Sequence, residues 1–383
     1  MNLFSAGHRD LKAIPTPAAL IDVRRMQSNI RRMQEHMHAL GVAFRPHAKT
    51  AKCLRVTQAQ NDAGAKGITV STLKEAERFF AGGVSDITYA VGIAASKLPQ
   101  ALGLMRRGCA LNILADSVES ARAIAEFGQS NKAVFDVLIE IDTDGHRSGT
   151  PPESQELPDI AAALTAGGAQ LKGVLTHAGS GYALSERAAL ETLAEQERAL
   201  CVRAAERLRQ AGHACPVVSV GSTPTAIRAV SLAGVTEARA GVYVFFDLVM
   251  RNVGVCSMDD IALSVLTSVI GHQKEKGWAI VDAGWMAMSR DRGTARQDTD
   301  FGYGQVCSPD GVPMPGYIVS DANQEHGIVS ASGGMDAKIA ERFPLGSLLR
   351  ILPNHACATG AQFPEYYALA EDAMEVWPRF YGW

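Results

Sequence analysis

A lysine in the hexapeptide Arg45-Pro46-His47-Ala48-Lys49-Thr50 stands where covalent chemistry can occur. The apolar run Gly41 to Phe44 predicts a short strand, and Pro46 disfavours helix at the preceding residue, so the strand ends there. A lysine at the C-terminal end of a barrel strand, held among apolar neighbours, can lose its proton and form a Schiff base. We therefore predict that Lys49 anchors a cofactor; the alternative is a solvated surface charge, which most lysines are.

Two further segments place polar side chains at strand ends. His177-Ala178-Gly179-Ser180-Gly181-Tyr182 follows a predicted strand, and its glycines let a ligand approach the backbone. His177 has either a role in the site or the plain one of satisfying backbone carbonyls. Arg147, in the run Arg147-Ser148-Gly149 after another strand, can donate to an anionic oxygen, although a surface arginine is the alternative.

The loops after the seventh and eighth predicted strands favour an anion site. These loops are Gly221-Ser222-Thr223-Pro224-Thr225 and Arg239-Ala240-Gly241-Val242-Tyr243. Backbone N–H groups and hydroxyls at these two positions of a β/α barrel commonly hold phosphate. The pair of loops therefore predicts a phosphate-bearing ligand.

A candidate metal pair, His355 and Cys357, lies in the segment Leu352 to Thr359. We predict an extended segment here, in which side chains two residues apart share a face. Imidazole and thiolate together suit Zn²⁺, although Mn²⁺ or Co²⁺ could serve. Water or substrate would complete the coordination shell. Asp282 and Glu325, each two residues before a glycine, are either acceptors behind a metal-bound histidine or ordinary turn residues.

Alternating strands and amphipathic helices precede residue 256 and predict an α/β fold. Apolar strand runs of this kind indicate a parallel sheet covered on both faces, and eight of them indicate a (β/α)8 barrel over residues 16–255. After residue 256, strand runs punctuated by glycine and proline predict an all-β domain over 256–383, to which the segment 16–22 could add a strand. The predicted barrel strands are 42–44, 68–70, 87–91, 111–114, 134–141, 171–176, 216–220 and 236–244.

Composition excludes several classes of function. The 383 residues are 47% hydrophobic and 20% charged, with a formal net charge of -3, so the chain lacks the basic surface that nucleic-acid binding needs. Apolar runs are too short to span a membrane, and residues 1–8 show no basic start before an apolar stretch. Seven cysteines without close pairs favour a reducing compartment, and we expect a cytoplasmic enzyme acting on a small molecule.

Taken together, these motifs resemble the fold-type III pyridoxal phosphate (PLP) enzymes typified by alanine racemase, across nearly the whole chain. More closely, the chain is similar to the D-serine dehydratase and D-threonine aldolase branch. The residues that carry this resemblance are 45–50, 177–182, Gly221 to Thr225, Asp282-Ala283-Gly284, Glu325-His326-Gly327 and Pro353 to Cys357.

The resemblance implies a site and a reaction. Lys49 would form the Schiff base with PLP and act as the α-proton base, with Arg147 facing the phenolic oxygen of the cofactor. His355 and Cys357 would hold the metal, and a homodimer is implied. The expected activity is dehydration of 3-hydroxy-D-amino acids, such as D-threo-3-hydroxyaspartate or D-serine, to a 2-oxo acid and ammonia. D-Threonine aldolase activity is the alternative, and a non-catalytic PLP carrier a remote one. Around the cofactor's phosphate or ring the resemblance places Tyr182, Ser222, Thr223, Gly241 and Val242.

Overall fold

The computed structural model describes residues 10–371 and 373–383, and the chain divides into two compact units. One unit comprises residues 31–241 and 382–383; the other comprises residues 242–381 and the N-terminal segment that ends at Ile30. Residues 1–9, on which the prediction about the N-terminus rests, lie outside the described residues. Within the described ranges, no helix has the length and hydropathy needed to cross a bilayer.

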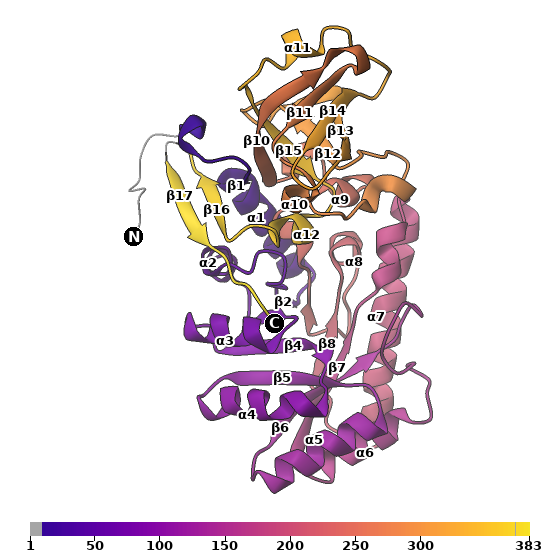
Figure 1. Ribbon diagram of the computed structural model, residues 1–383. Helices are drawn as coiled ribbons and strands as arrows, with labels where there is room; N and C mark the ends of the chain where they lie inside the picture. The colour runs from indigo at the N-terminus through magenta and orange to yellow at the C-terminus, as the bar shows by residue number, and fades with distance from the viewer. Residues whose placement is uncertain (1–9, 372) are drawn as a thin grey trace. The chain divides into compact units, whose positions relative to one another are not determined.

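Eight parallel strands form the sheet of the unit 31–241, as the sequence predicts (Figure 1). Their order is β2-β9-β8-β7-β6-β5-β4-β3, and its two ends meet where His47 bridges Thr69 and Ala48 N–H donates to the Thr69 carbonyl at 2.8 Å. The sheet therefore curls back on itself. The strands are β2 Ala43–Phe44, β3 Ile68–Val70, β4 Asp86–Gly92, β5 Ala110–Ala115, β6 Phe135–Ile141, β7 Ala169–Thr176, β8 Val217–Val220 and β9 Glu237–Ala238.

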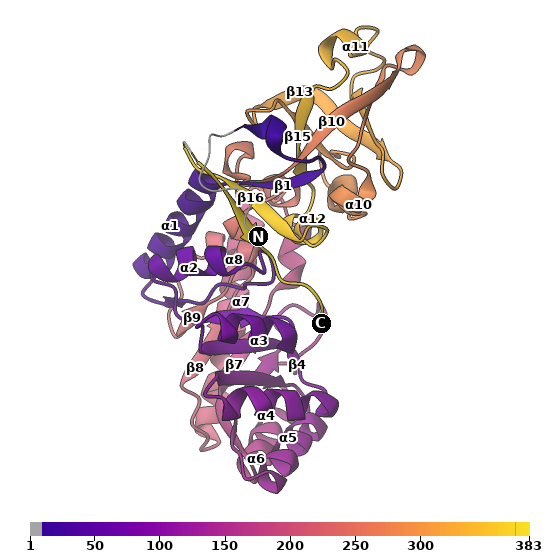
Figure 2. The same cartoon turned by 60° about the vertical axis from the view of Figure 1, so that its left-hand side comes forward.

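Helices join successive strands and pack on the outside of this sheet (Figures 1 and 2). Local sequence explains where several of them begin, because Thr72, Ser117 and Ser222 accept backbone N–H groups of the first turns of α3, α5 and α8. The helices are α2 Leu54–Asp62, α3 Leu73–Ala81, α4 Leu98–Arg106, α5 Val118–Ser130, α6 Leu157–Thr165, α7 Arg187–Gln210 and α8 Thr223–Arg228.

The eighth barrel strand is shorter than predicted. β9 ends at Ala238, and residues Val242–Val244 form a 3-10 helix, η4, where the sequence predicts continued strand. The chain leaves the sheet so that Gly241 can lie against the segment after β2, where an added Cβ would come within 3.2 Å of the His47 Cβ. The apolar residues 242–244 are buried within this 3-10 helix, so their apolar character does not indicate a strand. The prediction of strand at 242–244 is therefore wrong.

The second unit contains a nine-stranded sheet, in the order β11-β14-β13-β12-β15-β10-β1-β16-β17. Because β10 also pairs with β11, strands β10, β11, β14, β13, β12 and β15 close into a ring. The N-terminal strand β1 pairs antiparallel with β10 and parallel with β16. The strands are β1 Ala18–Asp22, β10 Leu263–Gln273, β11 Trp278–Val281, β12 Gly304–Cys307, β13 Pro313–Ala322, β14 Gly327–Ala331, β15 Leu348–Pro353, β16 Glu365–Leu369 and β17 Met374–Pro378.

Short helices interrupt these strands: α9 Leu248–Asn252, α10 Trp285–Met288, α11 Ile339–Arg342 and α12 Ala356–Gly360, while α1 Val23–Ala39 follows β1. Five of the strands, β10, β11, β13, β14 and β15, overlap the strand runs that the sequence predicts at 261–270, 278–281, 316–319, 327–330 and 347–351. Strands β12, β16 and β17 were missed, because runs of four or five residues with mixed polarity give little periodicity to detect.

Candidate active site

Lys49 lies half-buried in the turn that follows β2, at the C-terminal end of the parallel strands. Its backbone N–H faces Nδ1 of His47 at 3.4 Å, and Lys52 N–H closes the turn on the Ala48 carbonyl at 2.8 Å. Lys52 has a left-handed φ of 45°. Its Nζ pairs at 3.0 Å with Oε1 of Glu75, a buried carboxylate of α3. Backbone and side-chain contacts therefore both brace the turn that carries Lys49.

The surroundings of Lys49 are polar, which corrects the expectation of apolar neighbours. Burial lowers the pKa of His177 to about 3, and nearby positive charges add to this effect. Those charges belong to Arg147, Lys49 and Arg239. Burial, followed by Lys49 and Arg239, also holds the pKa of His47 well below its ordinary value. Both imidazoles are therefore held neutral within electrostatic range of three cations, which favour an anionic ligand such as a phosphate ester.

Arg239, which directly follows β9, is fixed by a buried polar network. Its Nε donates to Ser219 Oγ at 2.8 Å, and its Nη2 donates to the carbonyl of Thr176. Ser219 in turn donates to Glu237 Oε1 at 2.7 Å, and Arg45 Nε donates to Glu237 Oε2 at 2.9 Å. The guanidinium of Arg239 is therefore held at the strand ends by groups from β7, β8 and β9.

The loops after β7 and β8 meet at Gly221. An added Cβ at Gly221 would lie 2.2 Å from the Arg239 carbonyl oxygen, so only glycine fits, and its φ of 127° also requires glycine. Its carbonyl oxygen lies 3.1 Å from Nδ1 of His177. The next residue, Ser222, forms a capping box with Thr225 at the start of α8, and Thr223 is fully buried. Strand ends thus bring His177 and the predicted anion loop together.

The other predicted cofactor residues occupy neighbouring loops. Arg147 is exposed in the loop after β6, within electrostatic range of His177 and His47. The ring centroid of Tyr182 is 6.3 Å from that of His177. Gly241 lies against the Lys49 turn, and Val242 is a buried residue at the start of η4. All these residues follow barrel strands, as predicted.

His355 and Cys357 do not lie in an extended segment, which corrects the prediction. β15 ends at Pro353, His355 is the residue before α12, and Cys357 lies in the first turn of that helix. The two side chains still meet, because a hydrogen bond joins the imidazole of His355 to Cys357. Nδ1 of His355 also contacts Asp291 Oδ2 at 2.6 Å. Because Nδ1 is engaged by Asp291, a metal ion would be bound through Nε2.

The charge around His355 is negative and suits a divalent cation. Burial opposes protonation, but Cys357, Asp291 and the buried Asp247 together hold the pKa of His355 well above its ordinary value. A metal ion bound by Nε2 and the sulfur would replace that proton. A carboxylate on the other ring nitrogen is the usual support for a metal-bound histidine. The described residues contain no group of three or more His, Cys, Asp or Glu that could hold a metal, so this pair would need additional ligands.

Neither Asp282 nor Glu325 is the hydrogen-bond acceptor of the His355 imidazole. Asp282 accepts hydrogen bonds from Thr16 Oγ1 at 2.5 Å and from Thr267 Oγ1 at 2.6 Å, which ties β11 to its neighbours. Glu325 is exposed in the turn between β13 and β14. The acceptor behind His355 is Asp291, 64 residues earlier in the chain.

Sequence reasoning does not identify three polar residues of these sites: Arg239, Glu197 and Asp291. For Arg239 it predicts only a position in a loop. A signal for Glu197 existed, because an acidic residue on the apolar stripe of a helix must have a buried partner, and Glu197 lies among Leu193, Ala194 and Cys201 on the buried face of α7. Asp291 gave no comparable signal, since it lies in a charged loop.

Comparison with known proteins identifies both parts of the chain. A model of the alanine racemase N-terminal domain matches residues 21–249, and a model of a serine dehydratase domain matches residues 262–369. A D-threo-3-hydroxyaspartate dehydratase from Delftia sp. (strain HT23) is 64% identical over 376 residues, which cover 97% of this chain and 99% of that protein. A D-serine dehydratase from Dictyostelium discoideum is 29% identical, with 95% of each chain covered.

A solved structure is similar to this chain over the whole fold. It is a cysteine-to-alanine mutant of a D-threo-3-hydroxyaspartate dehydratase, in the metal-free form. Its TM-score is 0.96 at 63% identity, and the match covers 97% of this chain and 99% of that one. The alanine racemase-like fold predicted from the sequence is thus confirmed.

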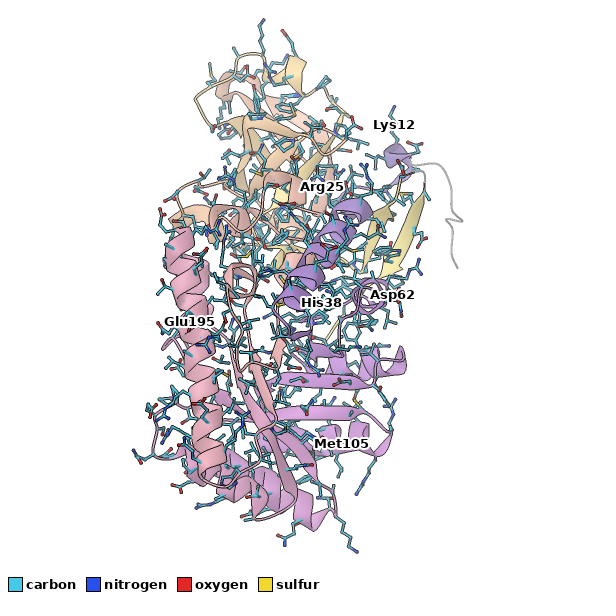
Figure 3. All side chains as sticks on the ribbon, turned by 180° about the vertical axis from the view of Figure 1, so that it is seen from behind. Lys12, Arg25, His38, Asp62, Met105 and Glu195 are labelled. Atoms are coloured by element: carbon cyan, nitrogen blue, oxygen red, sulfur yellow. The ribbon has the colours of Figure 1, made fainter. Side chains whose placement is uncertain are left out.

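The depressed pKa of His177 predicts that stability falls on acidification. Between about pH 6.5 and pH 3 the unfolded histidine binds a proton that the folded one does not, so the free energy of unfolding decreases as pH falls. His177→Gln should reduce this slope by up to about 1.4 kcal/mol per pH unit. Urea unfolding at pH 4.5, 5.5 and 7 measures it, with His38→Gln on the exposed side of α1 (Figure 3) as the control. Equal slopes for His177→Gln and wild type would contradict a neutral buried imidazole.

Proposed function

The chain belongs to the alanine racemase-like family whose members carry a serine dehydratase domain, and we propose that it is a PLP- and metal-dependent lyase of 3-hydroxy-D-amino acids. The products would be a 2-oxo acid and ammonia, and D-threo-3-hydroxyaspartate is the first substrate to test, given the 64% identity to a dehydratase of that compound. The observation that carries the proposal is the donor pair His355 and Cys357, supported by Asp291. Neither a racemase nor a cofactor carrier needs such a pair.

The parallel-barrel residues are suited to hold PLP. Bound PLP supplies an electron sink for the charge left at Cα of an amino acid. The cations Lys49, Arg147 and Arg239 favour its anionic groups, and Ser222 and Thr223, at the start of α8, are the proposed neighbours of its phosphate. Lys49 would be both the anchor and the base whose Nζ takes up the proton from Cα. Tyr182, Gly241 and Val242 complete the proposed surroundings.

His355 and Cys357 are suited to hold the metal. Bound metal supplies Lewis acidity, which makes a 3-hydroxyl a better leaving group. His355 Nε2 and the Cys357 sulfur would be its protein ligands, and Asp291 would keep the imidazole oriented through Nδ1. Imidazole with thiolate favours Zn²⁺, although Mn²⁺ or Co²⁺ could also serve.

We infer the assembly and the compartment from the family and the cysteines. We expect a homodimer, as the resemblance to fold-type III enzymes implies. The seven cysteines, all of them among the described residues, form no disulfide, which supports the reducing cytoplasm as the compartment.

Product analysis tests the reaction. With D-threo-3-hydroxyaspartate, D-serine and D-threonine as substrates, we expect oxo acid and ammonia in equal amounts. Chelation should abolish turnover, and added Zn²⁺, Mn²⁺ or Co²⁺ should restore it. Glycine and an aldehyde as the main products would show retro-aldol cleavage instead, and retained cofactor with no turnover of any substrate would favour a carrier.

Replacing Lys49 tests the anchor. Lys49→Ala should remove the visible absorbance of the lysine-linked cofactor and reduce turnover to background, because the covalent link and the base are lost together. Lys66→Met is the matched control, since Lys66 is an exposed lysine of the same parallel barrel. If absorbance and turnover persist in Lys49→Ala, the cofactor is attached elsewhere.

Replacing Cys357 separates the metal from the cofactor. Cys357→Ala should keep the cofactor absorbance but lose the metal and stop dehydration, because one of the two protein ligands is gone. Metal content by atomic emission and cofactor content by absorbance are measured on the same sample. The control is Cys109→Ala, a buried free thiol of the parallel barrel. An active Cys357→Ala enzyme with full metal content would exclude this metal site.

A further inference from the structure

Glu197 is a buried acid whose burial the fold alone does not explain. Among the buried residues of α7, which the structure describes throughout, it is the one acid; the others are leucine, alanine and cysteine. It is 2% exposed. A carboxylate in such a position is costly unless donors satisfy it.

The donors come from the two loops that hold the candidate site. Oε1 of Glu197 accepts the backbone N–H of Ala178 at 2.9 Å and that of Gly221 at 3.1 Å. The side chain also bonds with Thr225, in the first turn of α8. One carboxylate oxygen therefore links the loop after β7 to the loop after β8.

His177 depends on both of these loops. It directly precedes Ala178, and its Nδ1 lies 3.1 Å from the Gly221 carbonyl oxygen. A carbonyl only accepts, so Nδ1 must carry the hydrogen. Burial and the nearby cations, which lower the pKa of His177 to about 3, keep the ring neutral. Nε2 is then the unprotonated nitrogen, and the ring is a hydrogen-bond acceptor within electrostatic range of Lys49.

We propose that Glu197 is a positioning residue for His177. The carboxylate holds the N–H groups of Ala178 and Gly221 on one oxygen and so sets the spacing of the two loops. At this spacing the Gly221 carbonyl accepts the hydrogen of His177 Nδ1 and fixes that tautomer. Without the carboxylate, two buried N–H groups lose their acceptor and the loops separate or rotate. The imidazole is then free to exchange tautomers and to turn Nε2 away. Only the consequence for turnover rests on the proposed function.

Nitrogen NMR of ¹⁵N-histidine-labelled holoenzyme tests the inference. In the wild type at pH 7 we expect His177, assigned from His177→Gln, to show protonated Nδ1 and bare Nε2. Glu197→Gln keeps an oxygen that can accept both N–H groups, so it should preserve this signature and most of the activity. Glu197→Ala should give mixed tautomers and a kcat lower by between about 10- and 100-fold, with a smaller change in KM.

The control is Glu195→Gln, an exposed acid two residues earlier on α7 that pairs with Arg198 (Figure 3). A wild-type ring protonated at Nε2, or an unchanged single tautomer in Glu197→Ala, would overturn the proposal. The same holds if Glu197→Gln loses as much activity as Glu197→Ala. If Glu197→Ala does not fold, Glu197→Asp shortens the acid by one methylene and gives the same comparison. The tautomer is read without turnover, so a failure of the dehydratase proposal leaves this test intact.

Discussion

Charge compensation inside the parallel barrel is the constraint on which the candidate site depends. Arg45 donates to Glu237 and to Asp86, and Arg239 faces Glu237, Glu197 and Glu140. Arg45 and Arg239 are only 8% and 4% exposed. A buried charge that loses its partner costs about 3–5 kcal/mol, so these pairs hold the strands and α7 in one arrangement.

The network determines what the loops beyond it can do. Arg239 reaches the carbonyl at the end of β7, and the backbone of Arg239 leaves room for no side chain at Gly221. His177 and the anion loop are therefore placed by residues that need touch no ligand themselves. This end of the barrel therefore needs Gly221 and the buried Arg239 to place its loops, in addition to Lys49.

The two predicted ligand-binding regions have opposite electrostatics. In the parallel barrel, Lys49, Arg147 and Arg239 surround imidazoles that are held neutral. In the other unit, Cys357, Asp291 and Asp247 favour a positive charge on His355. An anionic cofactor and a metal cation are the complements of these two environments. Each region thus agrees with the ligand that its residue types predict.

The sequence by itself determined the eight barrel strands, the β-rich second part, and the candidate anchor and metal pair. These follow from local properties: strand periodicity, proline and glycine at strand ends, and ligand types close together in the chain. Tertiary structure alone decided the end of β9, the helical position of Cys357, and the partners Asp291, Arg239 and Glu197. The physical reason is that a buried charge is satisfied by groups distant in sequence. Asp291 lies 64 residues from His355, and Glu197 joins loops 19 and 24 residues away on either side of it. Local pattern shows that such a charge needs a partner, but only the folded chain shows which one.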